Sequence, residues 1–111
     1  MSNDTNPNLA EIQKTYHLID DNFDTIYAKC DPGQKTQLMA LRDSARDTFW
    51  RAAADNLSVD HAIVANTIDE LSTTNDQLSQ DVQSLADIAG FLDTLTQGVK
   101  LAAALATLAA A

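Results

Sequence analysis

The sequence has few of the residues that interrupt helices or build redox centres. Its 111 residues include three glycines, two prolines and one cysteine, and aromatic residues make up only 5%. So few glycines and prolines argue against the many short strands and turns of a sandwich or barrel, and favour an all-helical chain. A single cysteine excludes an intrachain disulfide, and its spacing from Ile26 predicts that Cys30 is a small buried apolar residue.

Basic residues are also scarce, because seven Lys and Arg stand against 16 Asp and Glu, for a formal net charge of −9. An acidic chain lacks the surface that releases counterions from a phosphate backbone, so we expect no nucleic-acid partner. The same charge disfavours an anionic membrane as the first contact and permits a basic protein partner. The first eight residues have no basic n-region and no apolar h-region, which predicts a cytoplasmic protein, with leaderless export as the open alternative.

Motifs for catalysis are absent as well. The sequence contains no Gly-rich phosphate loop, no G-x-S-x-G, no CxxC and no HExxH. The nearest approach to a metal site is a histidine with three carboxylates on adjacent turns: His17, Asp20, Asp21 and Asp24. The apolar stripe of the same segment indicates that these carboxylates belong to a solvated face. We therefore expect a protein that is not an enzyme and has neither cofactor nor metal.

The N-terminal half predicts a disordered lead-in over 1–7 and then a helix over 8–30. Asn8 followed by Glu11 three residues later has the form of a capping box. Behind it, apolar residues three and four apart form one stripe, namely Leu9, Ile12, Tyr16, Ile19, Phe23, Ile26 and Cys30.

The sequence Asp31-Pro32-Gly33-Gln34 ends this helix and begins the next. Pro32 suits a first helical position, Asp31 can cap the exposed N–H groups, and Gln34 stands in the reciprocal place. A second helix is expected over 32–56, with Leu38, Leu41, Ala45, Phe49 and Ala52 on its apolar stripe and Trp50 at the edge. So short a connection predicts an antiparallel hairpin.

The strongest pattern is a heptad repeat in the C-terminal half. Its first series is Leu57, Val64, Leu71, Leu78, Leu85, Leu92 and Val99, and the second is His61, Ile68, Asn75, Val82, Ala89 and Thr96. The alternating four–three spacing is typical of a coiled-coil seam. Asn75 at an a position either fixes the register or faces solvent at a helix break, and His61 is expected to be a cap or solvated.

The heptads predict a third helix over 58–100 with Ser58 as its N-cap. An unbroken helix of this length would span about 64 Å, whereas a compact chain of this size has a radius of gyration of about 13 Å. The weak helix formers of Ser72–Asp76 are the candidate break, but the apolar phase continues through them, so we favour a continuous helix there. The expected fold is all-α: an antiparallel helical hairpin plus a long third heptad-bearing helix, as one elongated helical bundle or coiled coil.

This seam predicts a homo-oligomer. Its interface would contain Val64, Leu71, Asn75, Leu78, Val82, Leu85, Leu92 and Val99. Acidic residues dominate the third helix, whereas the second carries Lys35, Arg42, Arg46 and Arg51. Packing of the second helix on the third would therefore bring opposite charges together.

The C-terminal tail, 101–111, consists mostly of alanine and leucine. The candidates for contact with a membrane or a partner are Phe91, Leu95, Leu101, Leu105 and Leu108. Asp87, Asp93 and Lys100 interrupt the apolar run, which disfavours spanning by a monomer. We expect the tail to be ordered and buried by the bundle, by another subunit or by lipid.

These features indicate a non-enzymatic helical protein–protein interaction module of the chaperone, adaptor or inhibitor type, assembling through the heptad seam. Its expected partners are itself, another protein, or both, with a basic protein among the candidates. One alternative is a membrane-active helical protein or small pore-forming component that uses its apolar C-terminal helix. Another is an acidic inhibitor of a protein with a basic site.

Overall fold

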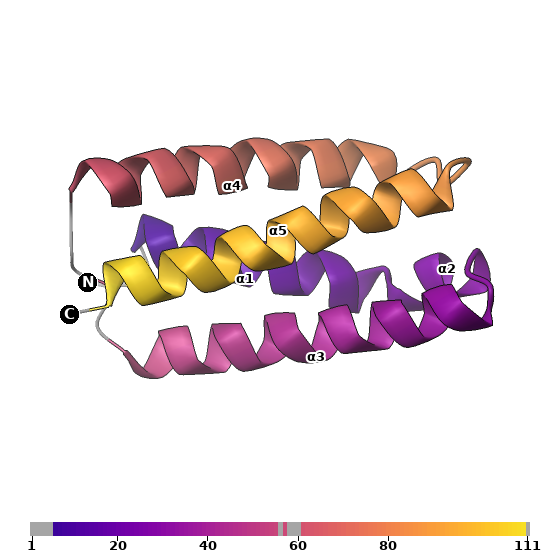
Figure 1. The fold of residues 1–111 in the computed structure, drawn as a ribbon, viewed down its shortest axis with the longest axis horizontal. Coiled ribbons are helices and arrows are strands. Elements are labelled where there is room, and N and C mark those ends of the chain that lie inside the picture. Colours follow the sequence, from indigo (N-terminus) through magenta and orange to yellow (C-terminus); the bar gives the residue numbers. More distant parts are fainter. Residues whose placement is uncertain (1–5, 56, 58–60, 111) are drawn as a thin grey trace.

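The structure is a computed structural model that describes residues 6–55, 57 and 61–110, and every regular element in them is a helix (Figure 1). The five helices are α1 (Pro7–Asp21), α2 (Phe23–Ala28), α3 (Pro32–Ala54), α4 (Ala62–Asp81) and α5 (Ile88–Ala109). Because α2 follows α1 after a single residue, the helices form a bundle of four columns. Its extents are 40 × 24 × 22 Å and its radius of gyration is 13.9 Å. The predicted all-α helical bundle is confirmed.

Two antiparallel hairpins, α1–α3 and α4–α5, build the bundle. Figure 1 shows α3 and α4 along opposite edges, with α1 and α5 between them. α5 packs along α4, α3 and α1, and α1 also packs along α3 and α4, whereas α3 and α4 do not pack along each other. The outer sides of α3 and α4 therefore point away from each other, and the apolar α5 lies in the middle.

The N-cap of the N-terminal helix lies two residues earlier than the sequence predicts. Asn6, not Asn8, is the N-cap: its side-chain oxygen accepts hydrogen bonds from the N–H groups of Asn8 at 3.0 Å and Leu9 at 3.2 Å. Pro7 then occupies the first helical position, where its missing N–H has no consequence. The predicted box of Asn8 and Glu11 is therefore wrong, and of the predicted lead-in, residues 1–5 lie outside the described residues.

The helix predicted over 8–30 is interrupted at Asn22. Its side-chain amide donates to the carbonyl oxygen of Leu18 at 2.8 Å, and its backbone leaves the helical region at φ −110° and ψ 12°. An Asn side chain competes with the backbone for such carbonyl groups, which gives the interruption a physical reason. The predicted turn at residues 31–34 is confirmed. Asp31 Oδ1 accepts from the Gln34 N–H at 2.7 Å, and Gln34 Oε1 accepts from the Asp31 N–H at 2.9 Å.

The prediction of one long third helix is wrong, because the chain reverses between α4 and α5. The segment Ser72–Asp76 is helical, as favoured, and the helix ends only at Asp81. The N–H of Ser84 then donates to the carbonyl oxygen of Asp81 at 3.0 Å, and Asp87 caps α5 by accepting from the Gly90 N–H at 3.0 Å. Leu85 is buried inside this turn, so the heptad phase continues although the helix does not. The predicted cap at Ser58 lies outside the described residues, and His61 is the N-cap without a side-chain hydrogen bond.

The core consists of two apolar clusters, one toward each end of the bundle. The first includes Ile19, Ile26, Leu38, Leu78, Leu92 and Leu95, and the second includes Ile12, Leu57, Val64, Leu71, Ala102 and Leu105. Four predicted core residues lie at the margins of these clusters and are half-buried: Tyr16, Phe23, Leu41 and Phe49. The C-terminal tail is helical through Ala109 and packs in the second cluster, so the bundle itself buries it, as one of the predicted options.

Replacement of Leu78 by alanine tests this assignment. Leu78 is 0% exposed, whereas Ile63 on the same helix is 58% exposed. We expect Leu78→Ala to lower the free energy of unfolding by about 2–5 kcal/mol because it leaves a cavity, and Ile63→Ala to change it by less than about 1 kcal/mol. Urea unfolding followed by circular dichroism measures both. Equal losses for the two variants would show that α4 does not present Leu78 to the core.

Candidate functional site

The heptad residues predicted as an oligomer interface lie inside the bundle of one chain. Buried in the two clusters are Val64, Leu71, Leu78, Leu85, Leu92 and Val99, and Val82 is half-buried at the end of α4. Other helices of the same chain already cover these side chains. Association through this seam would therefore require the bundle to open.

The predicted contacts of α5 with a membrane or partner also lie in the core. Phe91 is 3% exposed and Leu95 and Leu105 are 0% exposed, while Leu101 and Leu108 are half-buried against the second cluster. Among the described residues, we find no helix whose length and apolar character suffice to cross a bilayer. Lipid contact through these five residues would again require the bundle to open.

Between the two apolar clusters lies a polar layer formed by Glu11, Thr15 and Asn75. Asn75 is 1% exposed, and its amide Nδ2 donates to the carbonyl oxygen of Glu11 at 3.1 Å and to Glu11 Oε1 at 3.0 Å. The Thr15 hydroxyl lies 2.9 Å from Asn75 Oδ1 and 3.1 Å from the Glu11 carbonyl oxygen, to either of which it can donate. Every polar atom of the Asn75 side chain therefore has a partner on α1. The structure places Asn75 in the core, as the register-fixing interpretation requires, although its partners belong to the same chain.

Gly98 allows α5 to come close to this layer. A Cβ atom at Gly98 would lie 3.3 Å from Leu78 Cδ1 and 3.4 Å from Thr74 Cγ2, both on α4, and 4.0 Å from Thr15 Cγ2. A larger side chain would push α5 away from α4 and α1 at the level of Asn75. Three helices therefore meet where Gly98 leaves space.

A double-mutant cycle tests the bond between Thr15 and Asn75. Thr15→Val removes the one donor that the described residues supply to Asn75 Oδ1. We expect it to lower the free energy of unfolding by about 1–3 kcal/mol, since a buried acceptor is left unpaired. Asn75→Leu should cost less in the Thr15→Val background than in the wild type, because the bond between the two side chains is already absent there. Independent, additive losses in denaturant unfolding would contradict a direct bond between the two side chains.

A surface that the sequence analysis did not identify lies on the outer side of α3. This α3 outer face contains Lys35, Met39, Asp43, Arg46 and Trp50, spaced three and four residues apart. Trp50 is 62% exposed and Met39 is 40% exposed, and they are two of the three exposed large apolar side chains among the described residues. These residues lie outside the stripe of Leu38, Ala45 and Ala52, and that spacing was the available signal. It indicates exposure only once the stripe is known to be buried.

Aromatic packing between α1 and α3 supports the base of this face. The Phe49 ring stacks on Tyr16 with centroids 5.8 Å apart, and the Trp50 ring lies 5.4 Å from Phe49. The Arg42 guanidinium lies 3.9 Å from the Phe23 ring centroid, and its Nε is buried without a hydrogen-bond partner in the described residues. Stacking on an aromatic ring is the interaction that such a desolvated guanidinium retains. The base of the face is therefore packed, whereas Trp50 remains open.

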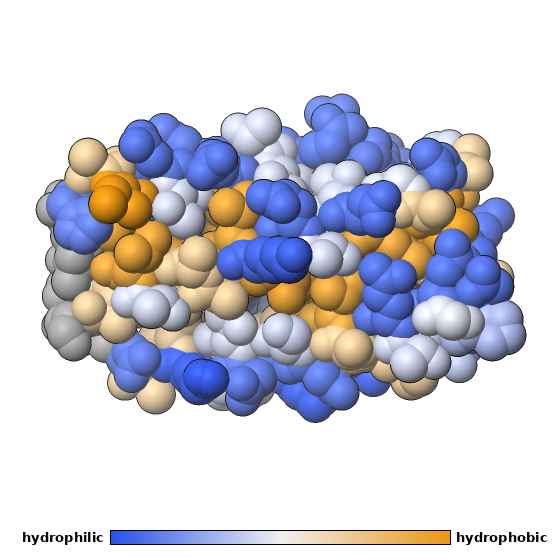
Figure 2. Space-filling model, viewed as in Figure 1, coloured by the Kyte–Doolittle hydropathy of each residue, from blue (hydrophilic) through white to orange (hydrophobic). Residues whose placement is uncertain are grey.

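Charge is distributed unevenly between the two edges of the bundle. α3 carries four basic and two acidic side chains, a net +2, and it is the only one of the five described helices with a net positive charge. α4 carries four acidic side chains and no basic one, a net −4. Figure 2 shows polar side chains along both edges and apolar groups between them. The expectation that opposite charges would join the second and third predicted helices is wrong for α4, since α3 packs along α5 instead.

The described ion pairs are all local contacts within single helices. They are Lys14 with Glu11, Arg46 with Asp43, and Arg51 with Asp47, at 3.1–3.4 Å. Within the described part of the chain, no acidic group of α4 has a basic partner. The four residues considered for a metal site stay on the surface turns of α1 and α2, and three metal-ligating side chains do not converge anywhere in residues 6–55, 57 and 61–110.

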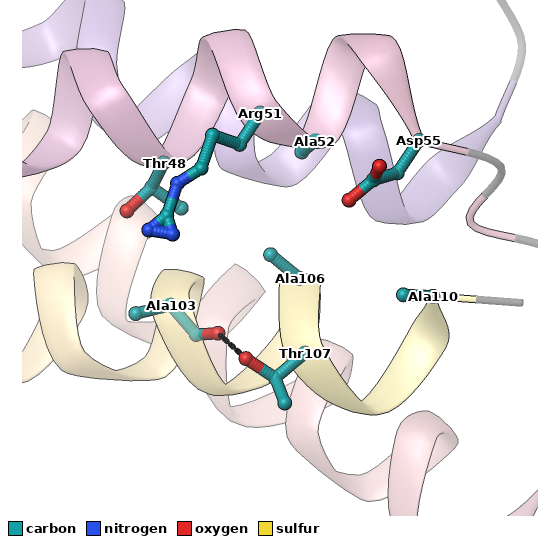
Figure 3. A pocket seen from close by; sticks show the side chains of 8 residues that line it. All are labelled: Thr48, Arg51, Ala52, Asp55, Ala103, Ala106, Thr107 and Ala110. Carbon is teal, nitrogen blue, oxygen red and sulfur yellow. Dashed lines mark hydrogen bonds between the residues drawn. The ribbon is translucent and has the colours of Figure 1, made fainter.

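A groove of about 330 Å³ lies between the C-terminal halves of α3 and α5. Figure 3 shows Arg51 and Asp55 on α3 facing the small residues Ala103, Ala106 and Thr107 on α5. Arg51 already pairs with Asp47, and the Thr107 hydroxyl donates to the carbonyl oxygen of Ala103 at 3.1 Å. The Arg51 and Thr107 side chains are therefore already engaged within their own helices.

Cys30 is 8% exposed, and its Sγ donates to the carbonyl oxygen of Ile26 at 3.3 Å, as expected of a buried residue. Burial raises the pKa of the Cys30 thiol, and the Asp31 carboxylate raises it further, against a smaller opposite effect of Lys35. The native thiol is therefore held in its protonated, unreactive form.

The reactivity of this thiol gives a direct test. We expect an aromatic disulfide reagent at neutral pH to label Cys30 more slowly in the native chain than in urea, with the rate rising as the pH rises. Because the folded pKa lies above the unfolded one, ionisation of Cys30 should also reduce stability as the pH rises beyond the ordinary thiol range. Equal labelling rates in the two states would contradict the burial of Cys30.

The chain matches no family model, no curated protein and no solved structure.

Proposed function

We propose that this protein is a non-enzymatic helical protein-binding module that docks its partner on the α3 outer face. The observation that carries the proposal is Trp50, an aromatic side chain that is 62% exposed on α3, which alone among the five described helices has a net positive charge. Trp and Arg are the residues most enriched among the hot spots of protein interfaces, and Met is also enriched at interfaces. The α3 outer face combines all three with a Lys.

The support beneath this face favours binding. Phe49 is held by Tyr16, and Trp50 lies beside Phe49, so the ring that would contact a partner rests on a packed base. An anchor held in place before binding loses less conformational freedom when a partner arrives. The basic groups around it would select an acidic partner surface and speed the encounter.

This proposal keeps the interaction module predicted from the sequence and changes its contact surface. The heptad seam is occupied within the chain, so a partner on the α3 outer face can bind without unfolding the bundle. The membrane-active alternative would require α5 to separate from α1, α3 and α4, which would disrupt most of the core. The inhibitor alternative is supported by α4, whose exposed acids suit a basic site, and it would use the opposite edge of the bundle.

The test compares Trp50→Ala with Lys100→Ala, which removes a long exposed side chain of α5 outside the α3 outer face. Immobilised protein is exposed to extract from the source cells, and captured proteins are identified by mass spectrometry. We expect Trp50→Ala to weaken capture of the partner by about 30-fold or more, the loss of a hot spot of at least about 2 kcal/mol. Lys100→Ala should leave capture unchanged, and both variants should keep the melting temperature of the wild type.

Capture that survives Trp50→Ala would contradict docking on the α3 outer face. Loss of capture through acidic residues of α4, with Trp50 dispensable, would support the inhibitor alternative instead.

A further inference from the structure

The two edges of the bundle are complementary to each other, although they cannot meet within one molecule. The α3 outer face has two basic side chains, Lys35 and Arg46, against one acidic side chain, Asp43, and it exposes Trp50 and Met39, whereas α4 has a net charge of −4. The exposed residues of α4 that point away from its core stripe form an α4 outer face: Asn66, Asp69, Glu70, Thr73 and Asp76. Since α3 and α4 do not pack along each other and occupy opposite edges, each face is open to another molecule (Figure 1).

We infer that the partner of the α3 outer face is the α4 outer face of a second copy of this chain. This inference rests on the proposed function and names its partner. Lys35 and Arg46 would meet carboxylates that have no basic partner in the described structure. Trp50 would lie on a surface of polar and short side chains such as Asn66 and Thr73, which leave room for an indole ring. Charge complementarity therefore favours a second copy over an unrelated neutral surface.

The position of the two faces determines the form of assembly. In a closed two-fold dimer, the same surface patch of both molecules forms the interface. Such a patch would have to contain both the α3 outer face and the α4 outer face, on one side of the molecule. Figure 1 shows the helices α3 and α4 on opposite edges of the bundle, which favours a contact between two different faces over a closed pair. Each added copy leaves one α3 outer face and one α4 outer face free, and the result is a head-to-tail chain of open length.

Two blocked variants make this arrangement testable. In the first, Trp50→Ala with Arg46→Glu removes the anchor and reverses a charge on the α3 outer face. In the second, Asp69→Lys with Glu70→Lys reverses two charges on the α4 outer face. All four positions are exposed, so the fold should be retained, and circular dichroism melts check it. Asp93→Lys, an exposed charge reversal on α5, is the matched control.

Light scattering and sedimentation measure the mass of each protein at rising concentration. For the wild type and Asp93→Lys, we expect the weight-average mass to rise continuously above the 12.0 kDa of one chain and to fall with added salt. Each blocked variant alone should remain at the mass of one chain. An equimolar mixture of the two should form a dimer and stop there, because the first variant keeps its α4 outer face and the second keeps its α3 outer face.

Three results would overturn the inference: a wild type that stays monomeric, a wild type that stops at a defined dimer, or a mixture in which the blocked variants do not pair. A monomeric wild type that still captures a cellular partner through Trp50 would overturn only this inference. The proposed docking on the α3 outer face would then stand with an acidic protein of another kind as its partner.

Discussion

The buried carboxamide of Asn75 has to find hydrogen-bond partners, and the arrangement of the helices follows from where those partners are. An unpaired amide in the core would cost about 1–3 kcal/mol, so α4 must lie beside a helix that presents acceptors and a donor at the same level. α1 presents them through Glu11 and Thr15. That pairing sets the register of the two hairpins, and Gly98 then allows α5 to approach at the same level. The apolar clusters on either side have no directional preference, so the polar layer is the part of the core that can specify one alignment.

Burial of the seam also decides which surfaces remain for function. Once α5 is covered by α1, α3 and α4, the apolar residues of the C-terminal half are used up in the fold, and the strongest exposed features are the outer sides of α3 and α4. These two sides differ in charge sign and lie at opposite edges. The proposed protein binding depends on these two sides, one with basic and aromatic side chains and one with acidic side chains. The net charge of the chain therefore does not indicate that basic and acidic side chains lie on different edges of the bundle, because that separation depends on the packing.

Much of the fold could be predicted from local signals. The stripes of α1 and α3 and the box of Asp31 and Gln34 follow rules that act within a few residues, and the structure agrees with them. The errors arose where two local signals competed. Asn6 with Pro7 prevailed over Asn8 with Glu11 as the helix start, and Glu11 turned toward Asn75 instead. The unbroken heptad phase concealed the reversal at residues 82–87, because a hairpin whose two helices face one core continues the same apolar pattern as a straight helix. The candidate site was harder still, since the exposure of Trp50 depends on what covers the neighbouring residues.

The sequence by itself determined the helical content, the turn between α1/α2 and α3, and the set of side chains that had to be buried. Apolar spacing and capping groups carry that information, because both act between residues that are close along the chain. The tertiary structure alone decided what buries the heptad seam and which faces stay open. A heptad pattern requires an apolar partner surface, and a helix of the same chain supplies it as well as a helix of another. The short turn at residues 82–87 holds α4 and α5 side by side in one chain. Their packing therefore avoids the loss of translational and rotational entropy that the association of two molecules entails.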